Sequence, residues 1–305
     1  MGRPTTVRRD PYYLGPAVEV AVSELQKYEK KNEWVIEPKL DGMFASYSIQ
    51  NPAEGRSHVL NSRDARTPPI TGTNAGDLLQ LPLPMLPEGT VLAGELEACT
   101  QWATKIVAQR GYRQFHAFDL LQVGKHSLRN LPLLERKRLL AATLTGLKED
   151  AHASSRIRLV TCESDHFEKR YHAWIAAGLE GVVLKKKNSL YKTRALDGKT
   201  LEWVRCKKTY TWDYVLIDTE LTAGGECGIQ QITGVWGLLV NGKYKKAMRA
   251  FAPPELLVPA NFGKLVAEFS GWALFKSGAL RHAQFSRIRT DKMPDACVLP
   301  EFTEE

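Results

Sequence analysis

The sequence predicts an α+β fold in two domains, and three observations support this. Short apolar or alternating segments typical of strands outnumber helical segments before residue 208. The helical segments interrupt the strands without alternating regularly with them, which favours antiparallel sheets over a βαβ array. Beyond residue 208 the predicted strands follow one another closely. We therefore expect a mixed domain over residues 1–208 and a smaller, mainly β domain over 209–305.

Local patterns define the elements of the first domain. A helix is predicted over 17–30, where apolar residues recur at helical spacing from Val18 to Leu25. Two more helices are predicted over 133–144 and 165–177, and Gly178 suits a helix stop. Strands are expected where short β-branched or aromatic runs occur, at 34–36, 45–49, 58–61, 91–93 and 114–121.

The second domain has a simpler pattern. A helix is predicted over 254–269, and strands at 214–222, 229–240, 244–251 and 285–288. About five strands with one inserted helix in a segment of this length are typical of a small closed barrel of the OB type. We therefore expect an OB-type β-barrel here.

Composition limits the possible partners and compartments. The chain has 305 residues, of which 43% are hydrophobic and 25% charged, as in ordinary globular proteins. Its net charge of +8 favours a polyanionic partner such as nucleic acid. The five cysteines form no Cys-x-x-Cys pair, which argues against a zinc site and fits a reducing compartment. No apolar run is long enough to span a bilayer, so we expect a cytoplasmic protein with no membrane partner.

The most informative motif surrounds Lys39, in the string Glu37-Pro38-Lys39-Leu40-Asp41-Gly42. Lys39 follows a predicted buried strand and precedes an Asp-Gly turn, a place where functional groups are often displayed. A lysine amine becomes a nucleophile once it loses its proton, and nearby positive charge favours that loss. Lys39 is therefore a candidate nucleophile; an exposed lysine before a hairpin turn is the alternative.

Five further segments carry the chemistry that a nucleoside triphosphate requires. Carboxylates accept hydrogen bonds from ribose or bind a metal ion, aromatic rings stack on a base, and cations hold phosphates. Each segment alone is also compatible with a loop, core or surface role. Their succession along one chain favours a shared site. The residues are Arg63, Glu95, Phe118, Glu180, Lys185, Arg205 and Lys207, the last two expected on one face of a strand.

This succession resembles the covalent nucleotidyltransferase superfamily, and within it the ATP-dependent DNA ligases, most of all the small two-domain ligases of bacteriophages. The likeness runs from about residue 35 to residue 292 and is strongest at 37–42, 180–185 and 203–207. The string Arg289-Thr290-Asp291-Lys292 is similar to the ligase C-terminal motif. The resemblance implies a nucleotidyltransferase (adenylation) domain followed by an OB-fold domain.

The resemblance also implies a role for each matched residue. Lys39 would form the phosphoamide bond to AMP, and Lys185, Arg205 and Lys207 would hold phosphates beside it. Nucleotide contacts would come from Glu37, Arg63, Glu95, Phe118 and Lys185. Glu95 and Glu180 would bind the metal ion. The residues that orient the departing pyrophosphate would be Arg289, Asp291 and Lys292.

The implied enzyme is a monomer that uses ATP and Mg²⁺ to seal nicks in duplex DNA. AMP would first be attached to Lys39 and would then pass to the 5′-phosphate at the nick. Its DNA contacts are expected in the basic segment 185–208, because phosphate binding needs clustered cations. The residues proposed for this are Lys186, Lys187, Lys192, Arg194 and Lys208.

Two positions depart from the family pattern. Phe44 stands where the family usually has arginine, and Arg205 stands where it usually has lysine. Arginine keeps the charge but donates a proton less readily. An RNA ligase or an mRNA capping guanylyltransferase of the same superfamily is the first alternative, and a non-catalytic nucleic-acid-binding protein is the second. The C-terminal string favours the DNA ligase.

Overall fold

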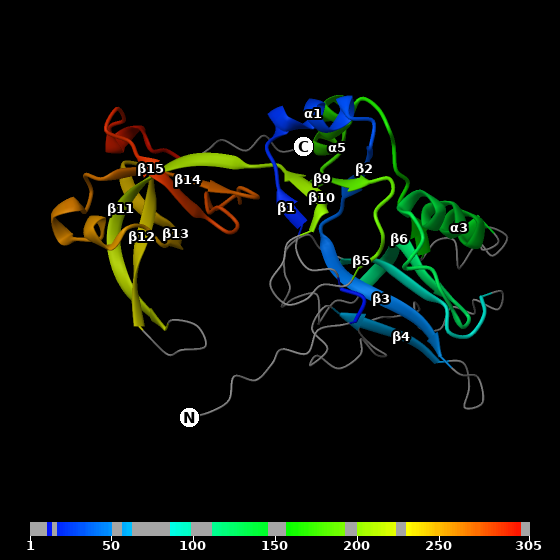
Figure 1. Ribbon diagram of the computed structural model, residues 1–305. Coiled ribbons are helices and arrows are strands. Elements are labelled where there is room, and N and C mark those ends of the chain that lie inside the picture. The colour runs from blue at the N-terminus through cyan, green and yellow to red at the C-terminus, as the bar shows by residue number, and fades with distance from the viewer. Residues whose placement is uncertain are drawn as a thin grey trace. The chain divides into compact units, whose positions relative to one another are not determined.

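The chain forms two compact units, residues 1–207 and 208–305 (Figure 1). The division falls one residue before the predicted boundary between 208 and 209. The computed structural model describes residues 11–13, 17–50, 57–62, 86–98, 112–145, 157–192, 200–223 and 230–299. None of the helices in these ranges is long and apolar enough to cross a bilayer.

The first unit contains two mainly antiparallel sheets. One has four strands in the order β1-β10-β9-β2, namely Ala17–Glu19, Thr200–Lys207, Gly181–Lys186 and Trp34–Lys39. The other follows the order β4-β3-β5-β6-β7, with bounds Ser57–Ser62, Gly42–Gln50, Val91–Ala98, Tyr112–Val123 and His126–Ser127. Parallel pairing occurs between β1 and β10, and between β6 and β8 (Ile157–Leu159). The sheets are therefore mixed, where the sequence led us to expect antiparallel pairing.

Strand alternation gives the first sheet one apolar and one polar face. The apolar face packs on α1 (Leu25–Lys30) and α5 (Phe167–Ala176), burying Trp34, Ile36, Val182, Leu184, Val204 and Cys206. Because neighbouring residues of a strand point to opposite faces, the residues between these point away from the helices. The polar face of this sheet is the one that carries the site.

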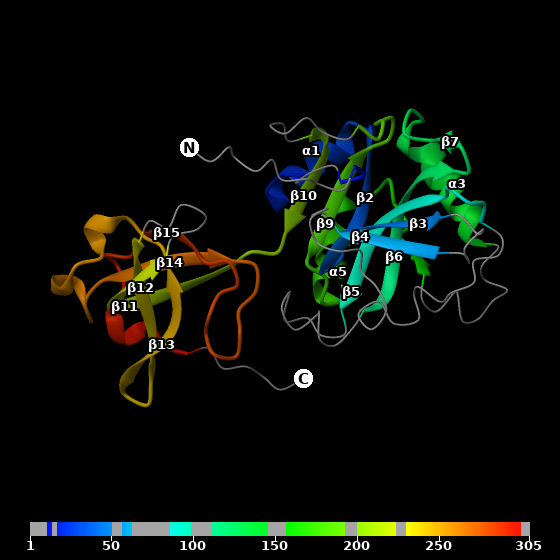
Figure 2. The ribbon, with the colours of Figure 1, turned by 90° about the horizontal axis from the view of Figure 1, so that it is seen from below.

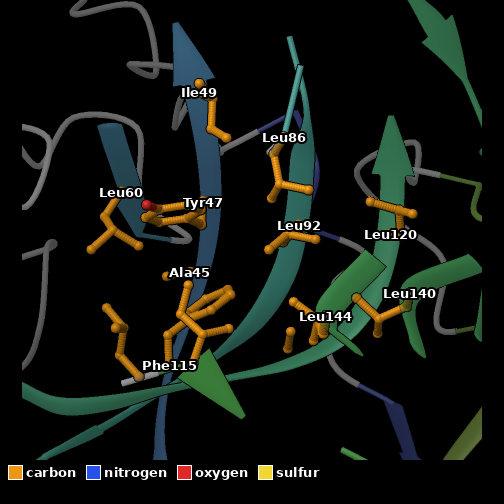
Figure 3. Close-up of a cluster of buried hydrophobic side chains, with 13 residues drawn as sticks. Ala45, Tyr47, Ile49, Leu60, Leu86, Leu92, Phe115, Leu120, Leu140 and Leu144 are labelled. Carbon is orange, nitrogen blue, oxygen red and sulfur yellow. The ribbon is translucent and has the colours of Figure 1, made fainter. Parts of the chain in front are cut away.

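The second sheet has its own apolar core, shown in Figure 3. Tyr47, Leu92 and Phe115 of three adjacent strands are fully or almost fully buried there. Leu140 and Leu144 of α3 (Leu133–Thr145) complete the cluster, and α3 packs on β6 (Figure 2). This packing fixes α3 beside the strand that carries Phe118.

The second unit is a five-stranded antiparallel sheet in the order β13-β12-β11-β14-β15. The bounds of β11 to β15 are Tyr210–Ala223, Gln230–Val240, Lys243–Ala250, Val266–Gly271 and Gln284–Ile288. In its core the rings of Trp236 and Phe269 meet edge to face, with their centroids 4.7 Å apart. Among the described residues of this unit, no pairing joins β13 to β15, so the paired strands form an open sheet and the OB-type barrel stays a prediction.

Of two further predicted helices, the one over 17–30 is confirmed only in its second part, and the one over 254–269 is wrong. Residues 17–30 form β1, a 3₁₀ turn η1 (Val22–Glu24) and the short α1, because Val18 pairs with Val204 at the edge of the sheet. Residues 254–269 form the 3₁₀ turns η6 (Pro254–Leu256) and η7 (Pro259–Asn261), followed by β14. A proline at 259 removes a backbone donor in the middle of the expected helix.

The remaining predicted elements are confirmed, most with longer bounds. The predicted helices over 133–144 and 165–177 are α3 and α5. Gly178 follows α5 at a φ of +83°, the left-handed conformation that glycine adopts without penalty. All the predicted strands are present in the described residues. Strand β2 ends at Lys39, and β5 extends past Glu95.

Candidate active site

One face of the first sheet gathers the polar residues singled out in the sequence. In the ladder, Glu37 lies opposite Val183 and Lys39 opposite Gly181. Arg205 and Lys207 lie opposite the same two residues from the other side. Paired residues of adjacent strands point to the same face. The face opposite the helices therefore carries Glu37, Lys39, Lys185, Trp203, Arg205 and Lys207.

Glu180 joins two of these cations. Its Oε2 lies 2.5 Å from the Nζ of Lys39, and its Oε1 lies 2.6 Å from the Nζ of Lys207. Burial raises the pKa of Glu180, but the two ammonium groups outweigh it and leave the pKa below its ordinary value. Burial also lowers the pKa of Lys207, against the opposing effect of Glu180. One ionised carboxylate thus orients the candidate nucleophile and a neighbouring phosphate-binding cation.

Two glycines permit this arrangement. Gly181 has a φ of +154°, and a Cβ there would lie 2.1 Å from the carbonyl oxygen of Cys206. At Gly42 a Cβ would lie 2.4 Å from the carbonyl oxygen of Leu96. Any larger residue would push β9 from β10, or β3 from β5. The glycines after Glu180 and Asp41 are therefore required for the close strand contacts beside the site.

Glu95 lies within β5 and brings a second carboxylate to Lys39. Burial raises its pKa to about 7; Lys39 opposes the shift, and Glu180 and Asp41 add to it. No group of three potential protein ligands for a metal occurs among the described residues. Mg²⁺, however, is usually bound through one or two carboxylates, substrate phosphates and waters. Glu95 and Glu180 fit that donor set.

A second cluster lies farther along the same face, around Glu37. Its Oε2 is 2.7 Å from the Nζ of Lys185, and its Oε1 is 2.6 Å from the Nζ of Lys137 on α3. All three side chains are at least 93% buried, since their exposed fractions are 2%, 2% and 7%. Lys137 also donates to the carbonyl oxygen of Val160 at 2.8 Å. Glu37 is therefore held from both sides.

Aromatic rings lie next to this cluster. The Nζ of Lys185 is 4.4 Å from the ring centroid of Phe118 and 4.0 Å from that of Trp203. Burial lowers the pKa of Lys185, although Glu37 opposes the shift. A carboxylate beside aromatic rings has the chemistry to recognise a purine, because the carboxylate can accept from its amino group and a ring can stack on its flat face.

A family model described as an ATP dependent DNA ligase domain matches residues 16–207, which include both clusters. The chain belongs to the ATP-dependent DNA ligase family. This confirms the resemblance read from the sequence.

Relatives of this ligase-family chain are distant. It is 27% identical over 216 residues to DNA ligase 2 of Methanosarcina mazei, covering 60% of this chain and 37% of that protein. The chain thus spans less than half of that relative. The solved ligase domain of LigD from M. tuberculosis has a TM-score of 0.50 at 21% identity, covering 95% of this chain and 99% of that one. A Lig E DNA ligase, described as binding DNA with a minimal scaffold, has a TM-score of 0.57 at 18% identity, covering 90% and 100%. Both structural likenesses show the fold.

The position of Phe44 in this ligase-family chain has a structural explanation. The residue lies opposite Glu95 in the ladder, and its ring centroid is 6.3 Å from that of Phe118 and 5.1 Å from that of Tyr13. The side chain that replaces the usual arginine thus joins the aromatic group beside Glu37. Arg205 binds Glu19 of β1 at 3.1 Å, so its guanidinium has an acidic neighbour.

The structure places the remaining predicted residues at several locations. The Nζ of Lys186 lies 3.8 Å from the Oε2 of Glu33, and the Nζ of Lys187 donates to the Oδ1 of Asn32 at 2.8 Å. Lys192 is exposed, and the Nζ of Lys208 lies 4.4 Å from the ring centroid of Tyr210. Arg289, Asp291 and Lys292 belong to the second unit and contact one another through Asp213 or directly. Arg63 and Arg194 lie outside the described residues.

Lys137 and Arg136 were not predicted from the sequence. Arg136 makes a bidentate pair with Asp119, at 2.8 and 2.9 Å, and both side chains are fully buried. The pair anchors β6 to α3 directly after Phe118. A sequence signal existed: Leu133, Arg136, Lys137, Leu140 and Leu144 follow helical spacing, so the two cations lie on the buried face of α3.

Proposed function

We propose that this chain is an ATP-dependent DNA ligase that seals nicks in duplex DNA through AMP carried on Lys39. The observation that carries the proposal is the Lys39–Glu180–Lys207 group on the polar face of the first sheet. An amine, an orienting carboxylate and a buried cation are the side chains that an attack on an α-phosphate requires.

The first step would be an in-line displacement. The Nζ of Lys39 gives a proton to Glu180 and attacks the α-phosphorus of ATP. A nitrogen–phosphorus bond forms as the bond to pyrophosphate breaks. Glu180, 2.5 Å away, orients the amine and is its nearest acceptor. Lys207 would lie against the phosphate, where positive charge stabilises the developing negative charge. Arg205 would support it on the same face of β10.

Glu37 and Phe118 would hold the adenine. The carboxylate would accept from the exocyclic amino group, and the ring would stack on the base. Bound by Glu95 and Glu180, Mg²⁺ would supply charge neutralisation at the phosphates. Lys185, expected at the phosphates, contacts Glu37 and the rings instead, so we assign it to the base.

The later steps would use DNA. AMP passes from Lys39 to the 5′-phosphate at the nick, and the 3′-hydroxyl then displaces AMP and closes the strand. Non-specific phosphate contacts would come from Lys186, Lys187, Lys192, Arg194 and Lys208, because such contacts position a protein without reading bases. Arg63 would contact the sugar or the 5′-phosphate. Arg289, Asp291 and Lys292 would orient the departing pyrophosphate.

The second unit would serve as an OB-type domain, in a monomer that works in the cytoplasm. Its five antiparallel strands and single apolar core support the first part of this proposal. Removal of residues 208–305 should leave weak nucleotide binding and abolish sealing. A truncated protein that seals at the full-length rate would refute a role for this unit.

A sealing assay tests the proposal. The protein is incubated with ATP, Mg²⁺ and a duplex nicked in DNA, or in RNA as the comparison acceptor. We expect sealing of the DNA nick by the native protein and by Lys27→Ala, an exposed control in α1. Lys39→Ala should seal nothing. Preferential sealing of the RNA nick, or use of GTP in place of ATP, would overturn the assignment.

A further inference from the structure

A row of charged side chains crosses one face of the five-stranded sheet in the second unit. Asp213 of β11 lies opposite Glu268 of β14, and Glu268 lies opposite Arg287 of β15. Paired residues point to the same face. The neighbours Tyr214, Ala267 and Phe269 are fully buried in the core on the other face. The row therefore forms a polar surface opposite the core. Strand β15 leads from it directly into the C-terminal motif.

Asp213 is the centre of this row. Its Oδ2 accepts hydrogen bonds from the Nη1 of Arg289 at 2.9 Å and from the Nζ of Lys292 at 2.8 Å. Its Oδ1 lies 3.2 Å from the same Nη1. Asp213 is 8% exposed, and the hydrogen bonds that it accepts are partly buried. One nearly buried carboxylate thus binds both cations of the motif.

Asp291 completes the arrangement from the other side. Its two oxygens accept from the Nε and Nη2 of Arg289, each at 2.8 Å, which is the planar fork geometry of a bidentate pair. The hydrogen bonds of Arg289 lower the pKa of Asp291 to about 2. Each of the three guanidinium nitrogens of Arg289 therefore donates to a carboxylate, either Asp213 or Asp291.

Charge and flexibility indicate what Asp213 does. Arg289 and Lys292 repel each other, and a lysine side chain has many rotamers, so neither would stay beside the other without a shared anion. Surface ion pairs usually contribute little, but this carboxylate is nearly buried and serves two partners. An anion of this kind holds two cations at a fixed separation, which is what binding of a two-phosphate group requires.

We propose that Asp213 is a positioning residue for pyrophosphate departure: it presents Arg289 and Lys292 as a fixed pair to the β- and γ-phosphates of ATP. The proposal rests on the proposed function, in which these cations act only in the first step. Asp213 itself touches neither the substrate nor the reacting atoms.

The test separates the first step from the last. Lysyl-AMP formation is measured with labelled ATP, and closure is measured on a nick that already carries AMP on its 5′-phosphate, without ATP. Asp213→Asn should slow lysyl-AMP formation about tenfold or more, because misplaced groups lose much of their effect. Closure of the pre-adenylated nick should change less than about twofold. Asp213→Glu should recover part of the lost rate.

Glu268→Gln is the matched control. Glu268 lies in the same row, and its Oε2 is 3.5 Å from the Nη1 of Arg289. The substitution therefore removes one negative charge, as Asp213→Asn does, but from a carboxylate that contacts Arg289 more weakly. We expect a small effect on both steps. Equal losses in both steps for Asp213→Asn, or a loss no larger than that of Glu268→Gln, would overturn the proposal.

A second pair of variants distinguishes this inference from the proposed function. If Arg289→Ala and Lys292→Ala slow lysyl-AMP formation but Asp213→Asn does not, the positioning role is wrong and the function stands. If neither alanine variant slows that step, the assigned role of the motif is wrong as well. Thermal unfolding of each variant identifies any that fail to fold, and Asp213→Glu then carries the test.

Discussion

Substitution of Lys137 by methionine tests the cluster around Glu37. Removing one partner of a buried ion pair costs about 3–5 kcal/mol when the other charge is left alone. Here Glu37 keeps one of its two cationic partners, Lys185 at 2.7 Å, so its charge stays partly compensated. We therefore expect Lys137→Met to lower the free energy of unfolding by about 2–3 kcal/mol.

The same substitution should weaken nucleotide recognition. Glu37 would lose the contact that fixes its Oε1, and the base-reading oxygen would no longer be held in one place. We expect the KM for ATP in lysyl-AMP formation to rise about tenfold. The preference for ATP over ITP, which lacks the 6-amino group, should fall by a similar factor.

Arg138→Met supplies the control on the next residue of α3. Arg138 has 70% of its side chain exposed and pairs only with Glu135 of the same helix among the contacts described. Its loss should change the free energy of unfolding by less than about 1 kcal/mol. Urea unfolding and initial-rate assays measure both variants.

A double-mutant cycle completes this test. In Glu37→Gln/Lys137→Met both charges are gone, so the double variant should lose less stability than the sum of the single losses. Strict additivity, or a Lys137→Met variant as stable and as selective for ATP as Arg138→Met, would refute the reasoning.

Three other predictions concern the group around Lys39. Because its pKa is about 7 when folded and lower when unfolded, Glu95 keeps its proton longer in the folded state, so its contribution to stability falls as pH rises from 4.5 to 7. Glu95→Gln should therefore raise the free energy of unfolding by about 2 kcal/mol at pH 8 and by less at pH 5. Urea titration at the two pH values measures this, and an equal change at both would contradict it. Gly181→Ala should cost more than about 3 kcal/mol, and Gly178→Ala, with open space around it, about 1 kcal/mol; similar melting temperatures would show that the strands separate easily. Lys207→Ala should reduce lysyl-AMP formation far more than Lys186→Ala, and equal losses would mean that the strand-face assignment is wrong.

Local patterns predicted the parts of the fold that depend on local interactions. Strand alternation placed Arg205 and Lys207 on one face, and the register confirms it. The first part of the helix predicted over 17–30 is a strand instead, because pairing of Val18 with β10 is a long-range contact that helical spacing does not show. Proline and glycine spacing in 254–269 carried the signal against a helix, but the apolar pattern concealed it.

The candidate site was predicted in its residues and only partly in its geometry. The motif strings named Lys39, Glu37 and Glu180, but the strings do not say that Glu180 lies between two lysines. Glu180 directly precedes β9 and Lys185 lies near the end of that strand, and the sequence assigned Lys185 to phosphates. The ladder sets it opposite Trp203, beside the aromatic rings. Lys137 and Asp213 contribute through contacts between elements distant in sequence, which motif spacing cannot show.

The account depends most on Lys39 as the residue that carries AMP. The direct measurement is incubation of the native protein with α-labelled ATP and Mg²⁺, followed by proteolysis and mass spectrometry of the labelled peptide. We predict an acid-labile AMP adduct on the Nζ of Lys39, formed equally by Lys27→Ala and absent from Lys39→Ala. An adduct on another residue, or labelling that persists in Lys39→Ala, would contradict the account.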